Sequence, residues 1–112
     1  MVVGTDNADK TYTGYFTKYG DGAVDLMPLK KILKKDVYEI GRVLSVPDSI
    51  LKKAPSADLW ENQTDEAEMG VSYSSIEKYI TGEKVSDNEE KIILSLHKKS
   101  EHKRNLPPYF DF

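Results

Sequence analysis

Apolar residues recur at helical spacing in two stretches of this chain. From Leu33 to Leu44 they fall three or four positions apart, with lysine, glutamate and arginine side chains on the opposite face. From Ser72 to Ile80 the same spacing returns, and it stops before Gly82, a residue type that commonly ends helices. The pattern predicts one amphipathic helix in each stretch.

Capping signals predict three further helical stretches. Residues 86–89, Ser-Asp-Asn-Glu, have the form of a capping box and begin a helix that we expect to run to about Arg104. Residues 47–51 open with a proline, whose backbone is already set for a first helical turn. Residues 64–66, Thr-Asp-Glu, begin a short helix that Gly70 ends. The inward residues of the longest of these helices are Ile92, Ile93 and Leu96.

The N-terminal part of the sequence predicts extended backbone. Residues 1–3 resemble the last residues of a buried strand, and residues 4–7 resemble a polar turn that starts a helix. Residues 12–19 are rich in threonine, tyrosine and phenylalanine and predict an extended segment, which breaks at the turn-forming residues 20–22. The strand end has no evident neighbour in the chain, so we expect its backbone groups to need another segment or chain.

Composition narrows the class of protein. The 112 residues, 38% hydrophobic and 31% charged, have room for one globular domain. No apolar run approaches a membrane span, the first residues lack a secretory signal, and there is no cysteine, which together favour a cytoplasmic location. A formal net charge of -3 provides no basic field for nucleic acid. Any anion-binding site must therefore be local.

The residues that could carry chemistry are hydroxyls, carboxylates and lysines in loops and at helix starts, a pattern that suits nucleotide binding. Each has a plainer interpretation. Thr5 and Asp6 could simply cap a helix, and the lysines of residues 30–35 could form a solvated face. Residues 101–104, Glu-His-Lys-Arg, could be an ordinary charged helix end. The aromatic residues 15–19 could belong to the core or to an interface.

Several longer strings of residues carry a resemblance to a known family. Residues 4–9, 13–22 and 25–29 closely resemble the C-terminal half of the ammonia-dependent NAD⁺ synthetases. Lys34 and the segments 53–59, 63–66 and 101–104 follow in the same order as in that family. The resemblance implies the C-terminal part of an α/β fold of the adenine-nucleotide alpha-hydrolase-like (Rossmann-like) type. This part is expected to be one domain over residues 1–112, mostly helical with one or two short strands.

The resemblance also implies an activity and a set of binding residues. The family uses ATP to adenylate the nicotinate carboxylate of deamido-NAD⁺, and ammonia then displaces AMP to give NAD⁺. By the resemblance, the ATP-contacting positions are Thr5, Lys34 and Ser56. The positions that contact deamido-NAD⁺ are Lys18, Asp25, His102 and Lys103. We expect Thr5, Lys18 and Lys34 to line a common hollow.

Two departures from the family pattern affect what we expect of this chain. At the family position of a magnesium-binding glutamate the chain has Lys10, which cannot ligate Mg²⁺, so Asp9 beside it is the remaining candidate ligand. The Ser-Gly-Gly-x-Asp-Ser loop that holds pyrophosphate in the family does not occur in these residues. We therefore expect no synthetase activity from the chain alone. A homodimer, or a partner chain bearing the N-terminal half, is the assembly that the resemblance implies.

Two non-catalytic alternatives stay open. The chain could be a helical remnant that associates with itself or a partner through residues 1–4 and 12–19, because an unpaired strand is an open edge. It could also be a module that binds a nucleotide without turning it over.

Overall fold

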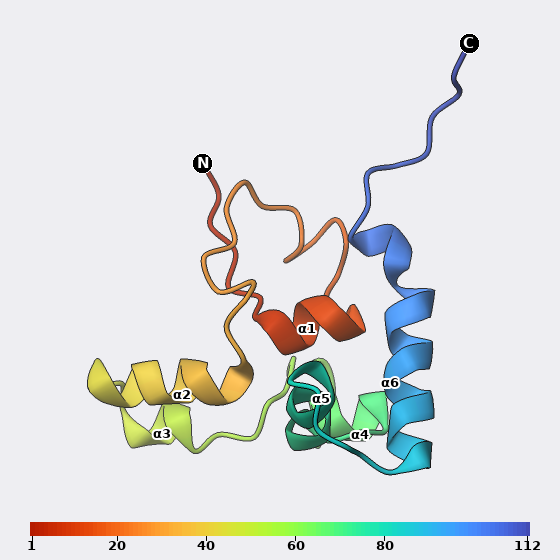
Figure 1. Cartoon of the computed structure of the whole chain (residues 1–112). Helices are drawn as coiled ribbons and strands as arrows, with labels where there is room; N and C mark the ends of the chain where they lie inside the picture. Colours follow the sequence, from red (N-terminus) through yellow and green to blue (C-terminus); the bar gives the residue numbers. More distant parts are fainter.

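Helix α1 (Ala8–Thr13) lies in the middle of the molecule in the computed structural model, which describes all 112 residues (Figure 1). Helices α4, α5 and α6 pack on one side of it, and the pair α2 and α3 extends on the other. The last residues form an extended tail that leaves the body of the molecule. The other bounds are α2 Lys34–Val43, α3 Asp48–Leu51, α4 Asp65–Met69, α5 Tyr73–Ile80, α6 Asp87–Lys99 and a 3₁₀ turn Glu101–Lys103.

The predicted helix starts are confirmed by their caps. The hydroxyls of Thr64, Ser72 and Ser86 each accept the backbone N–H three residues further on, which satisfies a donor that the helix leaves free. Glu89 returns a bond to the Ser86 N–H and completes the predicted capping box. Gly70 ends α4 in the left-handed backbone region, as its sequence position predicts.

Two predicted element boundaries are wrong. Residues 12 and 13 are helical, and residues 14–19 form turns rather than an extended segment. The reason is local, because the Asn7 side chain caps α1 and Gly14 ends it at φ 72°. Helix α6 ends at Lys99 rather than near Arg104, since the Ser100 hydroxyl turns back onto the carbonyls of Leu96 and Thr13. The chain then tightens into the 3₁₀ turn.

The expectation that residues 1–3 lack a partner within the chain is also wrong. Val3 forms a parallel bridge with Leu26, and the Gly4 N–H donates to the Leu26 carbonyl at 2.8 Å. The Val2 carbonyl accepts from the N–H groups of Asp25 and Leu26. Parallel pairing needs a crossover connection, which α1 and the turns after it supply. The chain therefore contains one minimal strand pair and no longer strand.

The core is small and lies between α4, α5 and α6. Ile76 and Ile93 are fully buried, and Tyr12 of α1 and Tyr15, just after α1, pack against this core. Burial of one such aliphatic side chain contributes roughly 1.5–3 kcal/mol. The remaining buried hydrophobic residues are Met69, Val71 and Tyr73.

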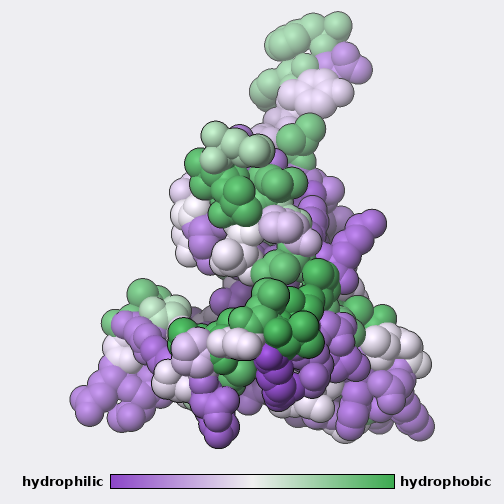
Figure 2. Space-filling model, turned by 90° about the vertical axis from the view of Figure 1, so that its left-hand side faces the viewer, coloured by the Kyte–Doolittle hydropathy of each residue, from purple (hydrophilic) through white to green (hydrophobic).

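Helices α2 and α3 pack on each other and bury no residue completely. The apolar face that predicted α2 is only partly covered, and Val43 and Leu44 are 84% and 71% exposed. Figure 2, viewed from the side of these helices, shows apolar surface gathered there. None of the helices combines the length and the apolar composition needed to cross a bilayer.

Candidate functional site

The start of α2 is held by two carboxylates from other helices. The Asp9 Oδ2 atom accepts from the Lys34 N–H at 2.7 Å, and Glu77 accepts from the Lys35 N–H at 2.8 Å. These bonds satisfy two of the free donors at the helix start and place negative charge at the positive end of its dipole. They fix the position of Lys34 relative to α1 and α5.

The Lys34 ammonium lies over two aromatic rings. Its Nζ atom is 4.5 Å from the centre of the Tyr73 ring and 5.6 Å from that of Tyr38. Burial lowers the pKa of Lys34, and the positive charge of Lys10 lowers it further. A hollow of about 290 Å³, the Lys34 hollow, opens beside it. It is lined by Lys34, Lys35, Tyr38, Pro55, Glu66, Tyr73, Ser74 and Glu77.

A buried carboxylate, Asp65, forms an ion pair with Lys10 and lies near Lys34. Asp65 is 1% exposed, and its Oδ2 atom accepts from the Tyr73 hydroxyl at 2.7 Å. The Lys10 Nζ atom lies 3.8 Å from the same oxygen. Burial and the bond to Asp65 raise the pKa of Tyr73, so this hydroxyl remains a donor at neutral pH.

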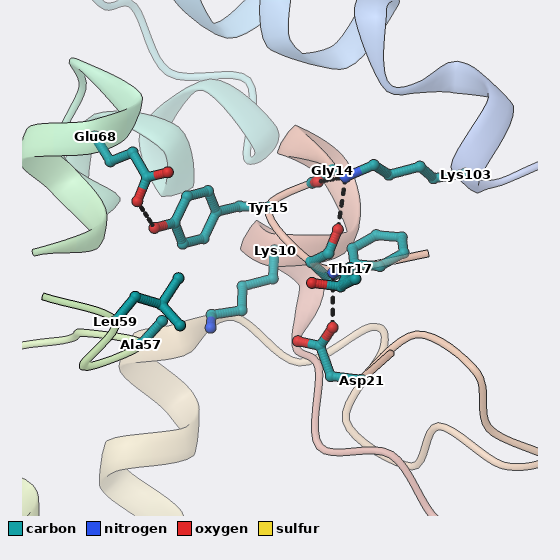
Figure 3. Close-up of a pocket in the computed structure, with 10 residues that line it drawn as sticks. Lys10, Gly14, Tyr15, Thr17, Asp21, Ala57, Leu59, Glu68 and Lys103 are labelled. Atoms are coloured by element: carbon teal, nitrogen blue, oxygen red, sulfur yellow. Dashed lines mark hydrogen bonds between the residues drawn. The ribbon is translucent and has the colours of Figure 1, made fainter. Parts of the chain in front are cut away.

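A second hollow of about 270 Å³, the Lys10 hollow, lies beside the Lys10 side chain (Figure 3). One wall is Tyr15, whose hydroxyl donates to Glu68 at 2.5 Å, and Gln63 donates to the same oxygen at 2.8 Å. The opposite wall is the turn after α1, where Asp21 accepts from the Thr17 N–H at 2.6 Å. Ala57 and Leu59 add apolar surface.

The C-terminal turn contributes Lys103 to the lining of the Lys10 hollow. Lys103 donates to the carbonyls of Gly14 at 2.8 Å and of Phe16 at 2.6 Å, so it holds the turn that follows α1. His102 is exposed, and its Nδ1 atom lies 3.5 Å from the Lys18 Nζ atom. Residues more than eighty positions apart in the sequence thus meet at one edge of the molecule.

The predicted binding residues are partly brought together. Lys18, His102 and Lys103 form one cluster, and Lys34 lies in the Lys34 hollow next to the segment that carries Ser56. The Ser56 hydroxyl accepts from the Asp58 N–H at 3.0 Å. The two remaining predicted residues are Thr5, which is exposed, and Asp25, which accepts from the Val2 N–H at 2.7 Å.

Thr5, Lys18 and Lys34 do not line one hollow. Lys34 lines its own hollow, whereas Thr5 and Lys18 line neither that one nor the Lys10 hollow. These 112 residues therefore do not enclose the common hollow that we expected. The individual assignments to ATP and to deamido-NAD⁺ stay predictions.

Sequence patterns alone do not identify Tyr73 and Tyr15 as residues that line the hollows. Helical spacing predicts only that Tyr73 belongs to a helix, and Tyr15 is expected only in a core or an interface. Both make polar contacts across long sequence distances, to Asp65 and Glu68 respectively. The available signal was composition, since a buried tyrosine usually finds a partner for its hydroxyl. Which partner it finds depends on the tertiary fold.

Magnesium, which the resemblance implies, does not fit the residues of this chain. Asp9 is fully buried, its Oδ2 atom is bonded to the start of α2, and its Oδ1 atom faces no polar partner. Lys10 follows Asp9 in the sequence, and its positively charged side chain lines the Lys10 hollow. No group of three or more His, Cys, Asp or Glu side chains could hold a metal ion. Mg²⁺ needs several oxygen ligands in near-octahedral geometry, which these residues do not provide.

Two solved structures that share this arrangement of helices are named as synthetases. The fold superimposes on a structure of NMN synthetase from Francisella tularensis with a TM-score of 0.95 and 50% identity, covering 98% of this chain and 46% of that one. A crystal structure of NAD⁺ synthetase from Burkholderia pseudomallei matches with a TM-score of 0.64 and 32% identity, over 94% of this chain and 39% of that one.

Sequence comparison also finds synthetases as relatives of this chain. Residues 1–107 match the NAD synthase family, and the chain belongs to it. The chain is 53% identical over 108 residues to the NH(3)-dependent NAD(+) synthetase of Alkaliphilus oremlandii, covering 96% of this chain and 43% of that protein. It is 56% identical over 108 residues to the NH(3)-dependent NAD(+) synthetase of Mannheimia succiniciproducens, with the same two shares. The chain thus spans less than half the length of these relatives.

Proposed function

We propose that this chain forms the C-terminal half of an enzyme that amidates the nicotinate carboxylate of deamido-NAD⁺. ATP adenylates the carboxylate with loss of pyrophosphate, and ammonia displaces AMP to give NAD⁺. The observation that carries the proposal is the cluster of Lys18, His102 and Lys103, assembled from opposite ends of the chain at the positions that the family implies for the dinucleotide. The 53% identity to a relative named for this reaction supports it.

In this proposal the two lysine-containing regions serve different substrates. Lys34, held by the capped start of α2, supplies positive charge to ATP together with the hydroxyls of Thr5 and Ser56. Lys18 supplies charge to deamido-NAD⁺, and Asp25 accepts from a ribose or amide group. The protein's task is to align the carboxylate with the α-phosphorus and to balance phosphate charge. The rest of the relatives' length would complete an α/β nucleotide-binding fold of the Rossmann-like type, in the cytoplasm and as a homodimer.

The experiment that tests the function supplies the missing length. We expect NAD⁺ formation from deamido-NAD⁺, ATP and ammonia only when this chain is mixed with one bearing the Ser-Gly-Gly-x-Asp-Ser loop, because that loop holds the leaving pyrophosphate. Lys34→Met should lower turnover of the mixture, whereas the exposed Lys52→Met serves as a matched control. Turnover by this chain alone would contradict the expected division of labour, and no turnover by the mixture would contradict the function.

A second substrate is supported by the fold comparison. The neighbour with a TM-score of 0.95 is named an NMN synthetase, which makes the mononucleotide rather than the dinucleotide. The same amidation would then act on nicotinate mononucleotide. Assaying the mixture with each substrate at equal concentration separates the two, since the preferred one has the higher kcat/KM.

A further inference from the structure

The Lys10 hollow contains four charged side chains, and three of them are already hydrogen-bonded. Glu68 accepts from Tyr15 and Gln63, Asp21 accepts from the Thr17 N–H, and Lys103 donates to two carbonyls. Lys10 also lines the hollow, but its ammonium makes no hydrogen bond. Lys10 is therefore the only charged side chain of the hollow that makes no hydrogen bond, and its three N–H donors are unused.

The position of the Lys10 ammonium has clear structural causes. Its nearest carboxylate oxygen, Oδ2 of Asp65, lies at 3.8 Å and already accepts from the Tyr73 hydroxyl. The Nζ atom is 5.6 Å from the centre of the Tyr15 ring. The side chain is 26% exposed, and in Figure 3 its amine points across the hollow toward Ala57 and Leu59. The cation is thus held in place by charge and by an aromatic face, with its donors free.

We propose that Lys10 binds a phosphoryl group directly in this hollow, without a metal ion. An ammonium is a compact charge with three rotatable donors, which suits the tetrahedral oxygens of a phosphate or pyrophosphate. A volume of about 270 Å³ admits such a group but not a whole dinucleotide. Lys103, on the same hollow, adds positive charge, and the carboxylates of Asp21 and Glu68 are already hydrogen-bonded to other groups of the lining.

The residues around Lys10 do not supply the oxygen ligands that Mg²⁺ needs, so a phosphoryl group there must be held by another cation. Where a carboxylate would need a bridging divalent cation to hold a phosphate, the Lys10 ammonium needs none. The proposal does not rest on the proposed function, because the Lys10 ammonium, which makes an ion pair with Asp65 but no hydrogen bond, and the hollow are observed whatever reaction the complete protein performs. Binding of inorganic pyrophosphate to the 112-residue chain tests it without any turnover.

The test is a calorimetric titration with pyrophosphate in the presence of a chelator. We expect saturable binding by the unchanged chain and a loss of affinity of about tenfold or more in Lys10→Met, which keeps the apolar stem over Tyr15 but removes the charge. Lys10→Arg should retain binding within about threefold, since it restores a cation with free donors. Lys99→Met, an exposed lysine on α6, removes the same charge elsewhere and should have no effect. Circular dichroism verifies that each variant is folded.

Three results would overturn the proposal. Equal affinity in Lys10→Met and the unchanged chain would make Lys10 only a counterion of Asp65. Binding that appears only after Mg²⁺ replaces the chelator would restore the metal site. Lys10-dependent binding of nicotinate without binding of pyrophosphate would assign the hollow to a carboxylate.

Discussion

The body of the molecule and its α2–α3 arm are stabilised in different ways. The body, formed by α1, α4, α5 and α6, surrounds the fully buried Ile76 and Ile93 and is crossed by hydrogen bonds between distant residues. The arm buries no residue completely, and its start is tied to the body by the carboxylates of Asp9 and Glu77. The amphipathic helix α2 is thus positioned relative to the body by hydrogen bonds at its N-terminus rather than by burial of its apolar face.

The difference matters for the candidate site. The Lys10 hollow is built mostly from the body, by α1 and its following turn, α4 and the C-terminal turn, and Ala57 and Leu59 join it from the segment between α3 and α4. The Lys34 hollow lies at the junction, with Lys34 and Tyr38 from the arm facing Tyr73 from the body. Anything that loosens the arm should therefore disturb Lys34 and leave Lys10 in place.

Removing core packing from the body should have the largest effect. Ile76→Ala should lower the free energy of unfolding by roughly 2 to 5 kcal/mol, because it deletes buried methyl groups and leaves a cavity. Val43→Ala on the exposed face of the arm should change it by about 0.5 kcal/mol or less. Urea denaturation monitored by circular dichroism measures both. Similar losses in the two variants would show that the arm carries a hidden part of the core.

A glycine that joins two parts of the body provides the second contrast. Gly14 has φ 72°, and an added Cβ would lie 2.0 Å from the Ser100 Cβ, so Gly14→Ala should destabilise by roughly 2 to 3 kcal/mol. Gly70 has φ 76° with open space around it, so Gly70→Ala should cost only about 1 kcal/mol of backbone strain. Thermal denaturation compares them. Equal melting temperatures would mean that Ser100 moves aside at little cost.

Removing the tie between body and arm should have a smaller and more local effect. Asp9→Ala leaves the Lys34 N–H without its acceptor and should cost about 1 to 2 kcal/mol. Hydrogen exchange of the Lys34 amide should accelerate, while that of the Leu96 amide in α6 should change little. Glu77→Ala, which frees the neighbouring Lys35 amide at a more exposed site, is the matched comparison. Uniform acceleration through α6 would refute the separation of arm and body.

The pH dependence of stability should contain two slopes of opposite sign, one from Asp9 in α1 and one from Glu89 in α6. Burial raises the pKa of Asp9 above its usual 3.8, so stability falls as pH rises from 3.8 through the raised value. Hydrogen bonds from Ser75 and Ser86 lower the pKa of Glu89 to about 2 from 4.5, so its contribution is lost as pH falls through that interval. Denaturation at several pH values should show Asp9→Asn removing the first slope and Glu89→Gln the second. A variant that leaves its slope unchanged would rule out that carboxyl as its source.

Much of the helical structure was predictable because its signals are local. The caps at Thr64, Ser72 and Ser86 satisfy donors within three residues, so sequence spacing alone locates those helix starts. Residues 12–19 were wrongly predicted to be extended. Their composition favours strands, but the cap at Asn7 and the turn at Gly14 determine their structure. Propensity is a weak signal where a helix is only two turns long.

The candidate site was predictable only through the family resemblance. That resemblance named Lys18, His102 and Lys103, which the fold does bring together, but periodicity and spacing give no reason for residues so far apart to meet. The role of Asp65 as a buried partner of Tyr73 depends entirely on tertiary packing. The parallel pairing of Val3 with Leu26 was missed for the same reason, because non-local contacts leave little trace in one sequence.

The contacts between α1 and the end of α6 have a consequence for how the chain folds. They join Tyr12 to His97, Thr13 to Ser100 and Gly14 to Lys103, so closing them requires a loop of 85 or more residues. Loop closure of that length is entropically costly, and high contact order slows folding. During synthesis on the ribosome, α1 can dock only after the more than eighty residues that separate it from the end of α6 have been made.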